Sequence, residues 1–587
     1  MMSLKLFTHS VASVLALATL CAATATAAIH PIYETDIALI PQSPIDKAVF
    51  AKLAQLKIQP VLCSDAVFVR RAYLDLLGIL PTPQEARDFI RNPDIRNKRR
   101  VLIDQLLQRP EYVDYWAMKW SDLLRIKAEF PVNLWPNAAQ AYHRWVRESL
   151  ARNKPYDQFA RELLTSSGSN FRVGPANFYR AAASRTPEGL ATVVALTFMG
   201  SRVDKWPREQ LAGMAAFFAQ VGYKPTSEWK EEIVFWDPIG ASTIRANIAP
   251  GRDAIVTTNP PPPLVLPTNV PPQVATFPDG KQIKLPPDKD PRIVFADWLI
   301  RPENPWFGRA IVNRMWYWLL GRGIIHEPDD IRPDNPPSNP ALLAYLEKEL
   351  VASRYDLKHM FRVIMNSYTY QFTSIPRVQS PEAVANFATY GVRRLDAEVL
   401  IDAINTITGT TDLYTSPIPE PYTYIPENIP AVGIADGSIT SPFLTMFGRS
   451  ARATGMESER DNNPIPAQWR HLLNSTHIQQ KIQQGPKLRA LFDSGRKPQE
   501  ILEQLYLTIL SRYPTPEELK TAEAYANFSG VAQVLAAASS GSGSKGKSKS
   551  DAKAVAVARQ AAYQKLREGW VDITWALINT HEFLYRH

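Results

Sequence analysis

Residues 66–90 read AVFVRRAYLDLLGILPTPQEARDFI, which joins an apolar helical pattern to a proline corner. Apolar side chains recur at steps of three and four residues up to Leu80, as they do on one face of a helix. Pro83 then follows Thr82, and proline suits the first position of a helix because its missing N–H would have no partner there. Glu85 stands three residues after Thr82, so the two side chains can cap the new helix reciprocally. The stretch predicts two helices joined by a capped corner.

The same corner returns near the end of the chain, where residues 506–525 read YLTILSRYPTPEELKTAEAY. Thr515, Pro516 and Glu518 take the capping positions here. A repeated binding module is one interpretation of this echo. We favour a helix–turn–helix corner used twice, because each shared residue already has a capping or packing role.

Helical periodicity extends over most of the chain and predicts a mainly α protein with two helical domains. The first helical domain is predicted over residues 45–235 and the second over 291–587. Residues 236–290 contain NPPPPLVLPTNVPPQ and the turn signal PDGK, which predict a Pro-rich connector with a few short β-strands. The segment EEIVFWDP, just before it, also has a β-like pattern. Residues 539–550, rich in Ser, Gly and Lys, predict a flexible insertion in the second domain.

Residues 1–28 have the pattern of a secretory signal peptide. Lys5 gives a positive start, residues 11–20 are apolar, and residues 25–27 read Ala-Thr-Ala, a small-residue cleavage site. The apolar run is too short for a membrane span, and no later segment is apolar enough for one. The sequence therefore predicts an exported protein, periplasmic or extracellular, with no membrane span.

The net charge bears on which partners the protein binds, and the cysteine content bears on whether it can form a disulfide. The formal net charge of +9 is modest for 587 residues, and in an exported protein it gives no argument for nucleic-acid binding. Loss of the signal peptide would leave Cys63 as the only cysteine, which predicts a chain without an internal disulfide.

The string GSGSKGKS at residues 541–548 satisfies the phosphate-loop pattern G-x-x-x-x-G-K-S. A working phosphate loop follows a buried strand and opens a helix, whereas the preceding VAQVLAAASS resembles a helix end. We therefore interpret the string as a flexible linker.

The chain has no strong metal-binding pattern. Its nine histidines are scattered and form no H-E-x-x-H motif. Asp329 and Asp330, in the loop GRGIIHEPDDIRPDNPPSNP, could hold Ca²⁺ or Mg²⁺, but Asp and Pro in loops more often form turns and helix caps. We assign no metal site, and the alternative at these two residues stays open.

Tryptophan is dense in two regions of the chain. Exposed Trp would suggest stacking on sugars, whereas Trp at helical spacing is more often part of a core, and we favour the core. The residues concerned are Trp116, Trp120, Trp135, Trp145, Trp306, Trp316 and Trp318.

Opposite charges crowd the stretch FGRSARATGMESERDNNPIPAQW at residues 447–469. They could build a polar site, or a buried ion-pair network that stabilises one conformation, and for any single residue we favour the network. The charged residues are Arg449, Arg452, Glu457, Glu459 and Arg460.

Several long stretches resemble a known pair of domains. FVRRAYLDLLGILPTPQEARDFI, WAMKWSDLLRI and NKPYDQFARELLTSSGSN resemble the Planctomycete cytochrome C-type domain of unknown function. FADWLIRPENPWFGRAIVNRMWYWLLGRGIIHEPDD, RRLDAEVLIDAI and WALINTHEFLYRH resemble its usual partner, the Planctomycete-specific domain of unknown function. The resemblance implies an exported protein, often encoded beside an exported partner with a phosphatase- or sulfatase-like fold.

The chain departs from this family at its haem motif. Family members usually carry C-x-x-C-H between an F-x-G-x-R stretch and a K-W stretch, but residues 197–206 read TFMGSRVDKW. Both flanking stretches are present, and neither the cysteines nor the histidine stands between them. Covalent haem attachment needs two thiols and a His ligand, so we predict a haem-free member without a cofactor.

Two functions of different classes follow. We favour a helical binding or scaffold protein that works beside an exported enzyme, in polysaccharide use. The alternative is a hydrolytic or metal-assisted enzyme with its site in the second domain, where Arg would hold an anionic or sugar group and carboxylates would act as acid, base or ligands. Convergence of the candidate side chains on one solvent-reaching pocket would favour the enzyme. The candidates are Arg314, Asp329, Asp330, Glu457 and Arg460.

Overall fold

The computed structural model describes residues 29–37, 39–129, 134–240, 273–526, 528, 530–531, 533 and 549–587. The predicted signal peptide, most of the Pro-rich connector and the GSGSKGKS string lie outside these residues. The described part is mainly helical, which confirms the predicted fold class. None of its helices is long and apolar enough to cross a membrane.

Many of the chain's 49 prolines stand at the first position of a helix, where the fixed φ of proline suits the first turn. The helices of the first region are α2 (Pro44–Gln55), α3 (Asp65–Leu77), α4 (Pro83–Arg91), α5 (Lys98–Leu106), α6 (Pro110–Leu123), α7 (Pro136–Ala151), α8 (Tyr156–Thr165), α9 (Asn177–Arg180), α10 (Pro187–Met199) and α11 (Arg208–Ala215).

In the second region, which follows residue 290, many helices again begin with proline. Its helices are α13 (Pro291–Leu299), α14 (Phe307–Leu320), α15 (Pro340–Ala352), α16 (Leu357–Met365), α17 (Pro381–Ala385), α18 (Ala397–Thr408), α19 (Pro442–Met446), α20 (Pro466–Asn474), α21 (Thr476–Gln484), α22 (Pro486–Phe492), α23 (Pro498–Ile509), α24 (Pro516–Ala526), α26 (Lys549–Ile578) and α27 (His581–Leu584).

The strands are short and antiparallel. The β-like segment EEIVFWDP forms the middle strand of the sheet β3-β5-β4, and the PDGK turn joins β6 to β7. The remaining pairs are β1 with β2 and β8 with β9. Their bounds are β1 (Glu34–Thr35), β2 (Leu62–Cys63), β3 (Gly168–Ser169), β4 (Val221–Pro225), β5 (Glu232–Trp236), β6 (Val274–Thr276), β7 (Gln282–Lys284), β8 (Arg393–Arg394) and β9 (Tyr585–Arg586).

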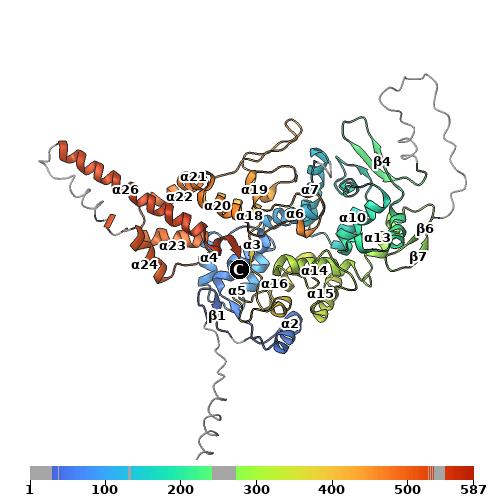
Figure 1. The fold of residues 1–587 in the computed structure, drawn as a ribbon, viewed down its shortest axis with the longest axis horizontal. Helices are drawn as coiled ribbons and strands as arrows, with labels where there is room; N and C mark the ends of the chain where they lie inside the picture. Colours follow the sequence, from blue (N-terminus) through green and yellow to red (C-terminus); the bar gives the residue numbers. More distant parts are fainter. Residues whose placement is uncertain are drawn as a thin grey trace, which may run out of the picture.

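Both predicted corners are present, and they lie side by side. Thr82 Oγ1 accepts the N–H of Glu85 at 3.2 Å, and the Glu85 carboxylate accepts the N–H of Thr82 at 2.8 Å. Thr515 and Glu518 make the same two bonds at 3.1 and 2.8 Å. Helix α4 after the first corner contacts α23 before the second (Figure 1). The corner is therefore a structural joint used twice.

One hydrophobic cluster includes buried side chains from both predicted helical domains. The ring centroid of Trp116, on α6, lies 5.2 Å from that of Trp318 on α14 and 4.3 Å from that of Phe361 on α16. Trp116, Trp120, Trp316 and Trp318 are buried, which confirms the core interpretation for these four. Helix α6 of the first region therefore packs directly on helices of the second.

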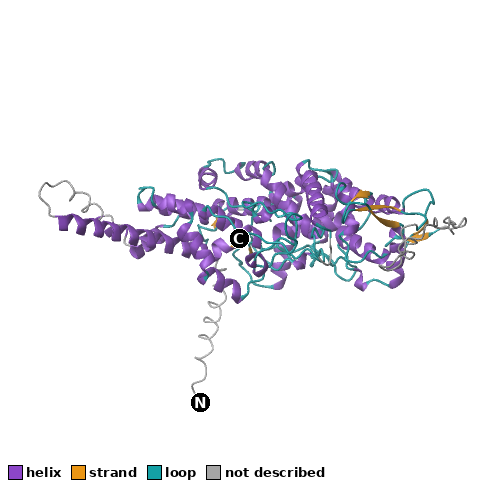
Figure 2. Ribbon diagram, turned by 90° about the horizontal axis from the view of Figure 1, so that it is seen from above, coloured by secondary structure: helices purple, strands orange, loops and turns teal. Residues whose placement is uncertain are grey.

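Helix α26 extends away from the rest of the molecule (Figures 1 and 2). The chain then returns through α27 and ends in β9, which pairs with β8. The end of the chain thus lies near the middle of the protein (Figure 1), where Arg586 is 4% exposed.

Candidate functional site

A polar cavity of about 50 Å³ lies where α6 and α14 meet the segments 393–396 and 457–462 and the end of β9. We call it the central cavity. Its walls combine five basic and two acidic side chains, so its formal charge is positive. The lining residues are Lys119, Tyr317, Trp318, Arg393, Arg394, Asp396, Glu457, Arg460, Asn462 and Arg586.

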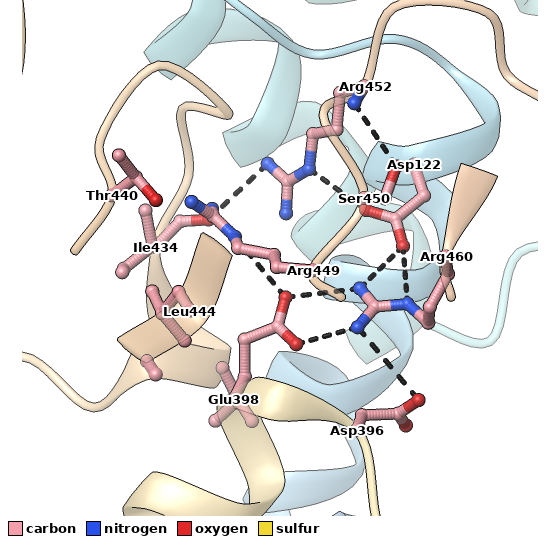
Figure 3. Close-up of polar contacts among 12 residues, drawn as sticks. Asp122, Asp396, Glu398, Ile434, Thr440, Leu444, Arg449, Ser450, Arg452 and Arg460 are labelled. Carbon is pink, nitrogen blue, oxygen red and sulfur yellow. Dashed lines mark hydrogen bonds and ion pairs between the residues drawn. The ribbon is translucent and has the colours of Figure 1, made fainter. Parts of the chain in front are cut away.

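Arg460 joins two carboxylates from different elements (Figure 3). Its Nη2 donates to Asp122 of α6 at 2.6 Å, and its Nη1 donates to Glu398 of α18 at 2.6 Å. Burial by itself raises the pKa of Glu398, but Arg460 and Arg449 outweigh it and lower that pKa to about 2. Arg460, Asp122 and Glu398 stabilise one another, because each of these charges would be buried without a counter-charge if the other two were absent.

Arg449 and Arg452 extend the same network (Figure 3). Arg452 Nε donates to Asp122 at 3.0 Å, and Arg449 Nε lies 3.3 Å from Glu398. The crowded charges of residues 447–469 thus form a buried ion-pair network at these arginines, as one of the two interpretations of that stretch predicted.

Asp396 is the acidic centre of the cavity wall. Its carboxylate lies 3.0 Å from Lys119 Nζ, and it accepts bonds from Arg586 Nη2 at 2.8 Å and Asn462 Nδ2 at 2.9 Å. Burial by itself raises the pKa of Asp396, but Lys119, Arg586 and Arg460 outweigh it and hold that pKa well below its ordinary value. Asp396 is therefore ionised and neutralises part of the positive charge around it.

Arg394 is a buried cation of the cavity with unpaired donor groups. It is 4% exposed, and its Nη2 donates to the carbonyl oxygen of Phe447 at 2.6 Å. Its Nε and Nη1 have no hydrogen-bond partner among the described residues, and the same holds for Nε of Arg393 and of Arg586. A buried N–H without an acceptor is unfavourable, so these donors need an acceptor that the described residues do not supply, such as water or an anionic group.

Arg314 and Asp329 form a buried ion pair beside the cavity. Arg314 Nη2 donates to Asp329 Oδ1 at 2.5 Å, and Asp329 Oδ2 accepts the backbone N–H of Glu457 at 2.7 Å. The Glu457 side chain lines the cavity and accepts the indole N–H of Trp318. Burial, and then the charge of Asp329, raise the pKa of Glu457 to about 7. Glu457 can thus exchange a proton near neutral pH, as a general acid or base must.

Asp330 lies apart from the other candidates, 3.2 Å from Arg332 and 3.5 Å from Arg202. Of the five candidates, Glu457 and Arg460 line the cavity, and the Arg314–Asp329 pair orients the backbone of Glu457. In the described part of the chain, no three or more His, Cys, Asp or Glu side chains cluster in a way that could hold a metal ion.

Sequence reasoning did not single out Arg394 or Arg586. They come together because β8 and β9 pair antiparallel, with Arg394 opposite Tyr585. The only local signal is the Arg-Arg pair that precedes Asp396 in RRLDAEVL, and nothing in it indicates that the chain end lies alongside.

Residues 200–206 do not fit a covalently attached haem. They contain neither Cys nor His, and Cys63 is buried in β2. Ser201 Oγ donates to the carbonyl oxygen of Ile331 at 2.7 Å, and the Ile331 N–H donates back to the Gly200 oxygen at 2.9 Å. Residues 200–201 are thus hydrogen-bonded to the loop that contains Ile331. The segment lacks the two cysteines and the histidine that attach a c-type haem.

Two consecutive parts of the chain match known families. Residues 44–223 match PSCyt2, described as a protein of unknown function (DUF1549), and residues 291–526 match PSD1, described as a protein of unknown function (DUF1553). No curated protein and no solved structure matches the chain. These matches confirm the resemblance that the sequence motifs indicate. The chain belongs to the proteins in which a DUF1549 domain is followed by a DUF1553 domain.

Proposed function

We propose that the protein is an exported, haem-free helical binding protein whose central cavity holds an oxyanion group of its ligand. The observation that carries this proposal is Arg394, a buried guanidinium whose Nε and Nη1 have no acceptor among the described residues. Each of these nitrogens belongs to a cation, so each can donate a charge-assisted hydrogen bond to a carboxylate, sulfate or phosphate oxygen. The leader pattern of residues 1–28 supports export, and residues 200–206 support the absence of haem.

The size of the cavity agrees with a small anionic group. One buried water molecule needs roughly 10–15 Å³ of cavity volume. The central cavity, of about 50 Å³, therefore has room for about three to five atoms of the size of a water oxygen. Carboxylate, sulfate and phosphate groups fall in that range. We propose that the cavity takes this part of a larger ligand, such as an acidic polysaccharide handled together with an exported enzyme of phosphatase- or sulfatase-like fold.

Glu457 supports a second candidate, a hydrolytic enzyme that uses the same cavity. Its carboxyl group has a pKa of about 7 and lines the cavity beside the unpaired arginine donors. A group of this kind could transfer a proton to or from a bound ester. The binding role predicts that Arg394 is needed to bind an anion. The enzymatic role predicts hydrolysis of an ester that requires Glu457.

Calorimetric titration with sodium sulfate, sodium phosphate and sodium acetate separates these functions. We expect at least one anion to bind, and Arg394→Met to weaken it at least tenfold, because a hydrogen bond to a charged group contributes about 1.5–3 kcal/mol. Arg394→Lys keeps the charge but loses the separate Nε and Nη1 donors, and it should bind with intermediate affinity. Arg172→Met is the matched control, because the Arg172 side chain is 74% exposed.

Binding of none of the three anions, or unchanged binding by a folded Arg394→Met protein, would contradict the binding role. Thermal unfolding of each variant establishes that it is folded. Hydrolysis of p-nitrophenyl sulfate, phosphate or acetate that disappears in Glu457→Gln would favour the enzyme instead.

A further inference from the structure

A second and larger cavity, of about 460 Å³, lies between α7 and the loop-rich segment 421–439. We call it the aromatic cleft. It shares no lining residue with the central cavity, and Arg452 of the ion-pair network donates to the carbonyl oxygen of Ala435 in its wall at 2.8 Å. The 3-10 turn η4 (Ala431–Gly433) of this segment packs against α6, which anchors one wall of the cleft.

Three aromatic rings cluster at the edge of the cleft. The ring centroid of Trp135 lies 5.0 Å from that of Trp229 and 5.3 Å from that of Tyr422, and the last two lie 5.5 Å apart. Trp229 is 61% exposed and Tyr422 is 44% exposed, although rings of this size are usually covered. Tyr422 and Tyr424 both line the cleft, so the cluster is continuous with it.

Buried polar atoms in the cleft lack partners. His143, Thr423 and Asp436 line it and are 5%, 6% and 1% exposed. Among the described residues, no hydrogen-bond partner reaches Nε2 of His143, Oγ1 of Thr423 or Oδ2 of Asp436. The other Asp436 oxygen accepts the backbone N–H of Ala128 at 2.9 Å, which orients the carboxylate. Buried polar atoms need partners, so these three indicate a ligand with several hydroxyl groups or water in its place.

The walls of the cleft carry little net charge. Burial, together with the charges of Arg452 and Arg147, lowers the pKa of His143 to about 3, so its imidazole is neutral at pH 7. Arg147 also lines the cleft, and its guanidinium is paired at 2.5 Å with Asp114, which is not a lining residue. The cleft therefore does not select for a strongly charged ligand, in contrast to the central cavity.

We propose that the aromatic cleft binds a neutral carbohydrate chain, with sugar rings stacked on Trp229 and Tyr422 and hydroxyl groups bonded to His143, Thr423 and Asp436. A pyranose ring has an apolar C–H face that packs on an aromatic ring. Its hydroxyl groups both donate and accept, so one ligand can satisfy a carboxylate, a hydroxyl and a neutral imidazole together. This inference does not depend on the proposed oxyanion site.

The test titrates the full chain with cellohexaose, xylohexaose and mannohexaose, using tryptophan fluorescence and calorimetry. We expect at least one of them to bind, and Trp229→Ala and Tyr422→Ala each to weaken it by about tenfold, equivalent to about 1.4 kcal/mol. Tyr525→Ala is the matched control, because Tyr525 on α24 is 64% exposed and lies outside the cleft lining. Asp436→Asn should also weaken binding, since it replaces the unpaired acceptor Oδ2 by a donor.

Three results would overturn the proposal. In the first, none of the three sugars binds. In the second, Trp229→Ala binds a sugar as tightly as the wild type does. In the third, the protein binds a proline-rich peptide and no sugar, and Trp229→Ala no longer binds that peptide. Arg394→Met should bind the sugars like the wild type. The anion titration and the sugar titration therefore test the two proposed sites separately, and either proposal can be contradicted without the other.

Discussion

The central cavity and the aromatic cleft both lie between segments that are distant in the sequence, yet their chemistry is opposite. The cavity is lined by five basic and two acidic side chains, whereas the cleft combines exposed aromatic rings with a neutral imidazole, one arginine and one carboxylate. In both, buried polar atoms lack a partner among the described residues. Such atoms indicate where a ligand can bind, and the charge of the surrounding walls indicates its class.

The two sites also differ in how they relate to stability. The wall of the central cavity belongs to the ion-pair network around Arg460, so a change there affects the fold as well as binding. The rings of the aromatic cleft are exposed, so they can be removed with little effect on the fold. Mutations that compare the two sites should therefore separate stability from binding.

The largest expected effect is that of Arg460→Ala. Removing this side chain leaves Asp122 and Glu398 without their shared cation, and breaking a buried pair in this way costs about 3–5 kcal/mol. Urea denaturation should show a fall of that size in the free energy of unfolding. Arg172→Ala, at a side chain that is 74% exposed, should change it by less than about 1 kcal/mol. Equal effects of the two changes would contradict the assignment of Arg460 to a buried network.

An intermediate effect, which depends on pH, is expected for Glu457→Gln. Because the native pKa is raised from 4.5 to about 7, the native protein binds this proton more tightly than the unfolded chain does. The contribution of Glu457 to stability is therefore fully present below about pH 4.5 and is lost as the pH rises to about 7. Glutamine cannot ionise, so the stability of the variant relative to the wild type should rise across this window by about 1–3 kcal/mol.

Thermal and urea unfolding at several pH values measure this difference. Other titrating groups are common to both proteins and cancel in the comparison. A difference that does not change with pH would show that Glu457 ionises in the folded protein as it does in the unfolded chain.

The smallest expected effect on stability is that of Trp229→Ala. Its side chain is 61% exposed, so the free energy of unfolding should change by no more than about 0.5 kcal/mol. Urea denaturation checks this value alongside the sugar titration. A loss of several kcal/mol would mean that the aromatic cluster holds the fold together, and the contrast between the two sites would disappear.

Local sequence was enough to predict the helices and their corners. Thr82 with Glu85, and Thr515 with Glu518, form the predicted capping boxes because each pair lies three residues apart. The buried Trp116 also followed from helical spacing. The family assignment rested on long local motifs and is confirmed by the matches to DUF1549 and DUF1553.

The candidate site was only partly predictable. The charged stretch at residues 447–469 indicated Glu457 and Arg460, and both line the central cavity. Asp330 was also a candidate, yet it lies outside the cavity lining and pairs with Arg202 and Arg332. Neighbouring acidic residues in one loop can face different partners, and their spacing in the sequence does not reveal which.

By itself, the sequence determined the helical fold class, the capped corners and the absence of the C-x-x-C-H motif, because each of these depends on residues within a few positions of one another. Only the tertiary structure decided which arginines are neutralised and which retain free donors. Arg394 meets Arg586 through the pairing of β8 with β9, and His143 meets Asp436 across the aromatic cleft. Whether a buried polar atom has a partner depends on side chains hundreds of positions away, and no local pattern contains that information.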